Sequence, residues 1–180
     1  MKLSIIIPTF NNYPYLKLCI NSILKNSNNK HEIIIHINGQ DVLTESFLKE
    51  KDYKFTKSDF NIGLCKGVNQ AASKATTNYI VYAHDDMYFL PNWDQYLIDE
   101  IIKLPDNLFY LSSTQINHLS VSKDKINHIT FDAGKSIDDF DENKLLLNYK
   151  KLKFHDLQGS HWAPHVMHKE IWNSVGGFSE

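Results

Sequence analysis

Short apolar runs alternate along the first half of the chain with longer segments in which apolar residues recur at helical spacing. The runs Leu3 to Ile7, Glu32 to Ile37 and Tyr79 to Ala83 are rich in β-branched or aromatic residues, as is typical of strands buried on both faces of a parallel sheet. Between the first two runs, apolar side chains repeat with the helical period at Leu16, Cys19, Ile20, Ile23 and Leu24. Strand, helix and strand in this order predict a right-handed βαβ unit.

Turn residues mark where these elements begin and end. Pro8 is expected to end the first strand, and Asn12 is expected to cap the next helix, with Pro14 in its first turn. From Thr114 to Asp141 the periodicity is lost, which fits either a substrate-side excursion or a variable surface loop. The remaining elements that the pattern predicts are helices at 43–51, 64–75, 93–104, 145–152 and 169–175, strands at 53–56, 108–113 and 166–168, and a short β-like piece at 126–131.

The length fits one α/β domain, and the strand pattern described above predicts that its sheet is mostly parallel. A chain of 180 residues, 42% of them hydrophobic, can bury one proper core, and a net charge of -2 leaves no basic footprint for nucleic acid. No apolar run approaches the roughly 18 residues of a membrane span, so we expect a cytoplasmic protein whose contact with a membrane is at most peripheral or through a partner. Cys19 and Cys65 fall among apolar residues of predicted helices and are expected to be buried thiols.

The candidate chemistry centres on Asp85 and Asp86, which follow the apolar run that ends at Ala83. In an open α/β sheet, ligands bind in the crevice at the carboxyl ends of the strands. Two adjacent carboxylates repel each other, and a divalent metal ion or a polycation is their natural partner. The alternative is a solvated acidic turn, or a cap for the helix that follows Pro91.

Other common chemistries find no support in the sequence. The histidines His118, His128, His155, His165 and His168 show no HxxxH or HExxH helix spacing among themselves, which argues against a zinc site. Neither a Gly-x-Ser-x-Gly elbow nor a Walker loop occurs, which argues against a hydrolase of that type and against a P-loop NTPase.

Four stretches together resemble the family 2 glycosyltransferases of the GT-A fold. They are Ser4–Asn12 with its helix, Asn61–Asn69 with its alanine-rich helix, the Asp85-Asp86 pair in the place of a DxD-type motif, and Gly176–Glu180 near the acceptor side. The resemblance implies a Rossmann-like, three-layer α/β/α domain over residues 1–180. Residues 1–113 would form its nucleotide-sugar-binding half, and residues 114–180 the start of its acceptor-side half.

The resemblance also implies roles for individual residues. Pro8, Thr9 and Phe10 would line the nucleobase pocket, while Asp86 would ligate Mg²⁺ or Mn²⁺ bridging the donor diphosphate. Asp85 would face the ribose or the sugar. The full donor-binding set is Pro8, Thr9, Phe10, Asn12, Asn38, Asp41, Asn61, Lys66 and Asp85.

Two departures from the family pattern alter what is expected. Where the family usually has an Asp-Asp-Gly-Ser type turn after the second strand, this chain has Asn38-Gly39-Gln40-Asp41, so Asn38 would bind the base and Asp41 the ribose. The general base of the family typically lies beyond the Gly-Gly-Phe segment. We therefore expect a fragment that lacks this base and part of the acceptor site, with Glu180 as the alternative base.

On the acceptor side, His161 and Trp162 would border the acceptor, because an indole face stacks well on a sugar ring. The alternative is a core tryptophan near the start of a strand. The sequence thus predicts an inverting, metal-dependent glycosyltransferase that moves a sugar from a nucleotide-diphospho-sugar, such as a UDP-sugar, to a glycan, lipid-linked or other hydroxyl acceptor. A non-catalytic nucleotide-sugar-binding module and a sugar nucleotidyltransferase are the alternative functions. The latter needs a glycine-rich basic loop, and Thr9–Asn12 does not provide one.

Overall fold

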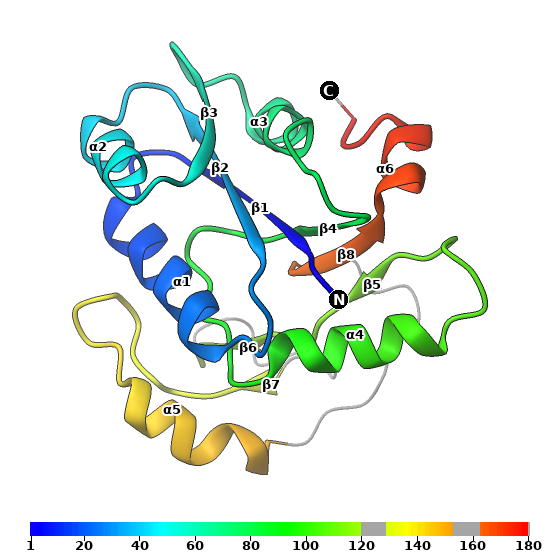
Figure 1. Ribbon diagram of the computed structural model, residues 1–180. Coiled ribbons are helices and arrows are strands. Elements are labelled where there is room, and N and C mark those ends of the chain that lie inside the picture. Colours follow the sequence, from blue (N-terminus) through cyan, green and yellow to red (C-terminus); the bar gives the residue numbers. More distant parts are fainter. Residues whose placement is uncertain (120–128, 153–162, 180) are drawn as a thin grey trace.

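A six-stranded sheet in the order β3-β2-β1-β4-β8-β5 forms the centre of the molecule (Figure 1). The computed structural model describes residues 1–119, 129–152 and 163–179. β3, β2, β1 and β4 run parallel, whereas β8 is antiparallel to both β4 and β5. The strands of this sheet are β1 (Ser4–Thr9), β2 (Glu32–Asn38), β3 (Lys54–Ser58), β4 (Tyr79–Tyr82), β5 (Leu111–Ser112) and β8 (His165–His168); β6 (Ile116–Asn117) and β7 (Ile129–Thr130) form a separate pair.

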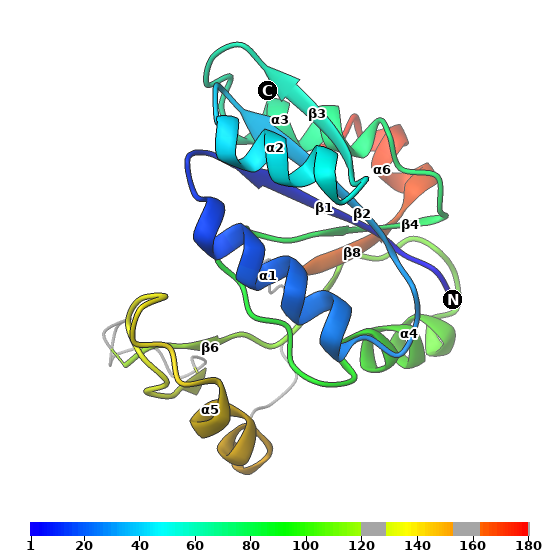
Figure 2. The same ribbon diagram turned by 60° about the vertical axis from the view of Figure 1, so that its left-hand side comes forward.

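Helices cover both faces of the sheet (Figure 2). Successive residues of a strand point to opposite faces, and the apolar residues of β1 and β2 are buried on both. Ile6 and Ile34 pack with Val68 and Trp172 on the face of α3 and α6. Ile5 and Ile7 belong to a larger core on the opposite face, which α1, α2 and α4 close. The predicted three-layer architecture is therefore confirmed. The helices are α1 (Tyr13–Asn26), α2 (Val42–Glu50), α3 (Leu64–Ala72), α4 (Trp93–Lys103), α5 (Glu142–Asn148), the 3-10 helix η1 (Tyr149–Lys151) and α6 (Lys169–Val175).

The expectation that Pro8 ends the first strand is wrong. β1 continues to Thr9, and Pro8 lies opposite His36 of β2. β4 leaves β1 after Ala83, whose N–H donates to the Ile6 carbonyl. Pro8 lies two residues after Ile6, so its nitrogen faces the same side of β1, where β4 has already left the sheet. The missing N–H of Pro8 therefore interrupts no hydrogen-bond ladder.

Other boundaries shift for local reasons. The helix predicted at 145–152 begins earlier, because the Asp141 side chain accepts a hydrogen bond from the Lys144 N–H and caps it. The strand predicted at 108–113 shortens to Leu111–Ser112. Both cysteines are free thiols, with Cys19 buried and Cys65 only half-buried.

Two buried carboxylates join the segments at the sheet edge where the parallel strands begin. Glu32 accepts hydrogen bonds from the Ser4 hydroxyl, the Lys54 ammonium and both the N–H and hydroxyl of Thr76, and so ties β1, β2, β3 and the chain before β4 together. Asp94 accepts from His31 and from the backbone that follows α1. The candidate site residues Thr9, Phe10, Asn38 and Asp85 lie at the opposite end of the parallel strands.

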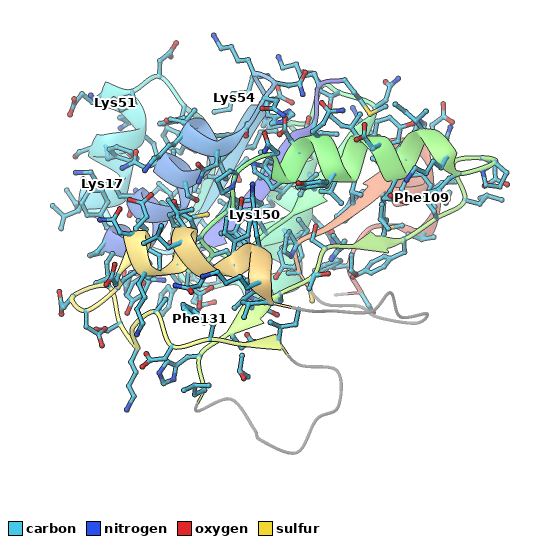
Figure 3. All side chains as sticks on the ribbon, turned by 90° about the horizontal axis from the view of Figure 1, so that it is seen from below. Lys17, Lys51, Lys54, Phe109, Phe131 and Lys150 are labelled. Carbon is cyan, nitrogen blue, oxygen red and sulfur yellow. The ribbon has the colours of Figure 1, made fainter. Side chains whose placement is uncertain are left out.

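The segment 129–152 lies across α1 and the chain after β4 (Figure 3, in which Phe131 and Lys150 are labelled). Glu142 forms an ion pair with Lys25 of α1 and accepts a hydrogen bond from Tyr88. The Ile137 N–H donates to the Tyr15 hydroxyl at 3.2 Å. None of the helices in the described part of the chain has the length and apolar character that a bilayer span requires.

Candidate functional site

The candidate site lies at the edge of the sheet where β1, β2 and β4 end. Asp85 and Asp86 form a turn that Ala83 and His84 separate from the end of β4. The Thr9 hydroxyl, at the end of β1, donates a 2.6 Å hydrogen bond to Asp85 Oδ2, and Asn12 donates a second one to the same carboxylate. Asp85 is thus the residue that joins the loop after β1 to the turn after β4.

The two neighbouring carboxylates have different surroundings. Burial raises the pKa of Asp85 above its ordinary value, the bonds from Thr9 and Asn12 oppose this rise, and the charge of Asp86 adds to it. The Asp86 side chain is 60% exposed, and its Oδ1 lies 4.0 Å from Nδ1 of the exposed His84. Asp85 is therefore held by protein groups, whereas Asp86 presents its oxygens to solvent.

The chain on either side of this turn is fixed by helix α1. The Cys19 thiol donates to the His84 carbonyl at 3.5 Å, and the Phe89 N–H donates to the Ser22 hydroxyl at 2.9 Å. Asn26 donates to the Phe89 carbonyl, and Tyr88 is bound to Glu142. The two carboxylates thus lie on a short segment whose two ends, at His84 and Phe89, are bound to α1. A ligand could therefore bind with little rearrangement of this segment.

Phe10, Gly39 and Asn61 lie together and form one wall of the site, called the Phe10 wall below. A Cβ atom added to Gly39 would lie 3.5 Å from the Phe10 ring and 3.7 Å from the Asn61 backbone nitrogen, and Gly39 has a φ of 113°. The Phe10 side chain is half exposed. An exposed aromatic ring beside backbone polar groups is a surface on which a planar base can stack.

Several predicted side chains have partners that the sequence did not indicate. Asn12 occupies the predicted N-cap position of α1, but its side chain forms no capping hydrogen bond and binds Asp85 instead. The buried Asn38 accepts from the Ile62 N–H at 2.8 Å and donates to the Gly63 carbonyl at 3.2 Å. Asp41 caps α2 by accepting from the Thr44 N–H and hydroxyl. Asn38 and Asp41 therefore shape the loops of this edge.

The remaining predicted residues are distributed as follows. Asn61 accepts from the Gly63 N–H at 2.9 Å, and Lys66 is exposed in the first turn of α3. His161, Trp162 and Glu180 lie outside the described residues. Among the described residues, no group of three or more His, Cys, Asp or Glu side chains could hold a metal ion by itself.

An aromatic cluster beside the carboxylates was missed in the sequence. Tyr82, the last residue of β4, packs against His165 of β8 and against Phe178, with ring centroids 5.1 and 5.0 Å away. Tyr110 shares a 2.7 Å hydrogen bond with His165 Nδ1. Burial, with a smaller contribution from His84, lowers the pKa of His165 to about 4, so the ring is neutral at pH 7. Within the described chain, the Tyr82 hydroxyl and His165 Nε2 are buried without a hydrogen-bond partner.

Comparisons with known proteins agree with the sequence resemblance. The family model for glycosyl transferase family 2 matches residues 4–171. S. aureus TarS 1–349 in complex with UDP is similar with a TM-score of 0.68 at 15% identity, over 97% of this chain and 49% of that chain. The mannosyltransferase PcManGT from Pyrobaculum calidifontis, in complex with GDP-Man and Mn²⁺, has a TM-score of 0.60 at 18% identity, over 98% of this chain and 47% of that chain. These likenesses establish the fold, and the chain spans about half the length of both structures.

Proposed function

The chain belongs to glycosyl transferase family 2, and we propose that it binds a nucleotide-diphospho-sugar together with a divalent cation and takes part in transfer of the sugar to a hydroxyl acceptor. One observation carries the proposal: Asp85 is hydrogen-bonded by the loop after β1, so the exposed Asp86 and the Phe10 wall lie at one edge of the sheet. Transfer by inversion, a UDP-sugar as donor and a glycan or lipid-linked acceptor belong to the same proposal. So does a cytoplasmic location, at the inner face of a membrane where the acceptor is lipid-linked.

The donor would extend along this edge from the base to the sugar. Pro8, Thr9 and Phe10 would contact the base, with Asn61 and Lys66 near the ribose or phosphates. Asn12 and Asn38 would act by holding the loops, and Asp41 would do so through α2. Asp85, bound to Thr9, would face the ribose or the sugar.

The residues of the turn fit a divalent cation. Mg²⁺ and Mn²⁺ prefer oxygen ligands, and Mg²⁺ commonly keeps several waters while binding one or two carboxylates and substrate phosphates. The exposed Asp86 carboxylate supplies such a ligand without a cluster of three acidic side chains. Asp86 would hold the ion, which would stabilise the charge that develops on the leaving diphosphate.

On the acceptor side, His161 and Trp162 would border the bound hydroxyl compound, and Glu180 or a carboxylate outside this chain would accept its proton. A binding module without transfer activity is the second candidate, since the donor edge just described would suffice for it. Release of nucleotide from a nucleotide-sugar separates the two candidates. A sugar nucleotidyltransferase is disfavoured because Thr9–Asn12 lacks glycine and basic residues.

The test is calorimetric titration of the chain with UDP, GDP and dTDP, with and without Mn²⁺. One nucleotide should bind in a metal-dependent manner, and Asp86→Ala should weaken it about 10- to 100-fold, the loss of one charge-assisted interaction. Asp99→Ala, which removes an exposed carboxylate on α4, is the matched control and should bind as the wild type does. Failure of all three nucleotides to bind would reject the donor site. Equal binding by Asp86→Ala would reject the metal assignment.

A further inference from the structure

We propose that Asn69 is a positioning residue that docks the segment Gly176–Ser179 onto helix α3 and so holds a wall of the active site beside the Asp85-Asp86 turn. The inference rests on the proposed function, and it concerns a residue in the middle of a helix that has no assigned part in the donor site.

Asn69 and Phe178 form two reciprocal hydrogen bonds across 109 residues of sequence. Asn69 Nδ2 donates to the Phe178 carbonyl at 2.9 Å, and the Phe178 N–H donates to Asn69 Oδ1 at 2.9 Å. The side-chain amide thus binds both backbone groups of one residue, as an adjacent β-strand would. Aspartate could supply only the acceptor, and alanine could supply neither group.

The two glycines before Phe178 permit this close approach. Gly176 and Gly177 have φ values of 80° and 73°, in the left-handed region that favours glycine. A Cβ atom on Gly177 would overlap Asn69 Oδ1 and lie 3.0 Å from Trp172 Nε1. The Gly177 N–H donates to the Trp172 carbonyl at 2.9 Å, so the end of α6 leads directly into the docked segment.

Docking places the Phe178 ring next to the carboxylate turn. The ring lies 5.0 Å from the Tyr82 ring and 5.4 Å from the Trp172 ring. Tyr82 also packs against His84, which immediately precedes the two carboxylates, with ring centroids 5.3 Å apart. Phe178 is therefore linked through Tyr82 to His84, the residue that precedes Asp85.

The Gly176–Ser179 segment lies on the side of the turn away from the surface proposed for the nucleobase. In the sheet, β4 separates β1 from β8, and the Phe10 wall belongs to the loops after β1 and β2, whereas His165 and Phe178 lie on the β8 side. A donor with its base at Phe10 and its diphosphate at Asp86 would direct its sugar toward the β8 side. The unpartnered Tyr82 hydroxyl and His165 Nε2 of the described chain lie there as well.

Helix α3 connects the two sides. Its first turn carries Lys66 at the donor edge, Gly67 packs on His36 of the sheet, and Asn69 holds Phe178. Loss of the Asn69 amide would release the segment Gly176–Ser179 while the Asn38 contacts that fix the loop before α3 remain in place. Transfer should therefore suffer while donor binding persists.

The test compares Asn69→Ala with Gln70→Ala, a control that places alanine at the next, exposed position of the same helix. In Asn69→Ala, hydrogen exchange of the Phe178 amide should accelerate about tenfold, as expected for loss of one hydrogen bond. The turnover number for release of nucleotide from a nucleotide-sugar should fall at least about tenfold, because a displaced wall would let the bound sugar move out of its reactive position. KM for the donor and calorimetric affinity for the nucleotide should stay within about twofold, a change too small to indicate a lost contact. Asn69→Asp, which keeps the acceptor, should retain part of the exchange protection, and Gln70→Ala should match the wild type.

Three outcomes would overturn the inference. Unchanged exchange at Phe178 in Asn69→Ala would reject the docking. Faster exchange with unchanged turnover would show that the docking is structural only. A rise in donor KM at constant turnover number would place Asn69 in donor binding. If the wild type binds no nucleotide, the proposed function fails and the catalytic part of the inference fails with it, while hydrogen exchange still decides the docking.

Discussion

Replacement of Glu32 by glutamine tests how the base of the sheet is held together. Glu32 is 8% exposed and accepts hydrogen bonds from Ser4 at 2.5 Å, from Lys54 at 2.5 Å and from both polar groups of Thr76 at 2.9 Å. Burial alone would raise its pKa, but the bonds from Lys54, Ser4 and Thr76 outweigh burial and lower the pKa from 4.5 to about 2.

The size of the effect follows from linkage. A pKa that is lower in the folded state than in the unfolded state by about 2.5 units corresponds to about 3 kcal/mol of stability at pH 7, at 1.36 kcal/mol per unit. Because the folded pKa is depressed, this contribution is fully present above pH 4.5 and is lost as the pH falls toward 2. Glu32→Gln should therefore lower the free energy of unfolding by about 3 kcal/mol at pH 7, and the difference from wild type should shrink steadily below pH 4.5.

The assay is urea unfolding at a series of pH values between 7 and 3, followed by circular dichroism. Glu45→Gln is the matched control: hydrogen bonds from Lys49 and Lys57 lower the pKa of Glu45 to about 2 as well, but this carboxylate lies at the surface, where solvent and salt screen it. Its effect should be much smaller and should vanish in high salt. A Glu32→Gln difference that does not change between pH 7 and pH 3 would refute the electrostatic explanation.

Two further substitutions test the packing around the site. Gly67→Ala should lower stability by about 1–3 kcal/mol despite the higher helix propensity of alanine, because its Cβ would lie 2.6 Å from Cδ2 of the buried His36; stabilisation in urea unfolding would contradict the close packing of α3 on β2. Tyr82→Phe should leave stability unchanged or raise it by about 1 kcal/mol, since the buried hydroxyl has no partner among the described residues, whereas Tyr88→Phe should cost about 1 kcal/mol because its hydroxyl binds Glu142 and Asn26. Equal losses in both tyrosine variants by thermal unfolding would show that Tyr82 has a polar partner.

The sequence predicted the structure best where burial in the core alone decides the local conformation. The continuous isoleucine runs of β1 and β2 allow few arrangements other than strands buried on both faces, and both were located to within two residues. The position of Asp85 and Asp86 at the end of β4 followed from the same argument, because the apolar run stops where the strand leaves the core. The fold, and the position of the two carboxylates at the end of β4, could therefore be predicted.

The partners of polar side chains could not be predicted in the same way. An asparagine near a helix start favours a capping role, yet Asn12 binds Asp85, which lies 73 positions further along the chain. Asn69 belongs to the Asn61–Asn69 stretch, but nothing in the local pattern indicates its contacts with Phe178, which lies 109 residues further along the chain. Such bonds depend on the packing of whole elements, which local pattern does not encode.

Asp85 also explains why the loop that carries Phe10 and the Asp85-Asp86 turn depend on each other. Thr9 and Asn12 flank Phe10 in the sequence, and both donate to the Asp85 carboxylate. The loop that carries the Phe10 ring is therefore held by the residue next to Asp86, so displacement of the turn would also displace the surface proposed for the base. A cation bound at Asp86 would fix the turn and, through Asp85, the loop after β1, which is the physical reason to expect nucleotide affinity and metal binding to be coupled.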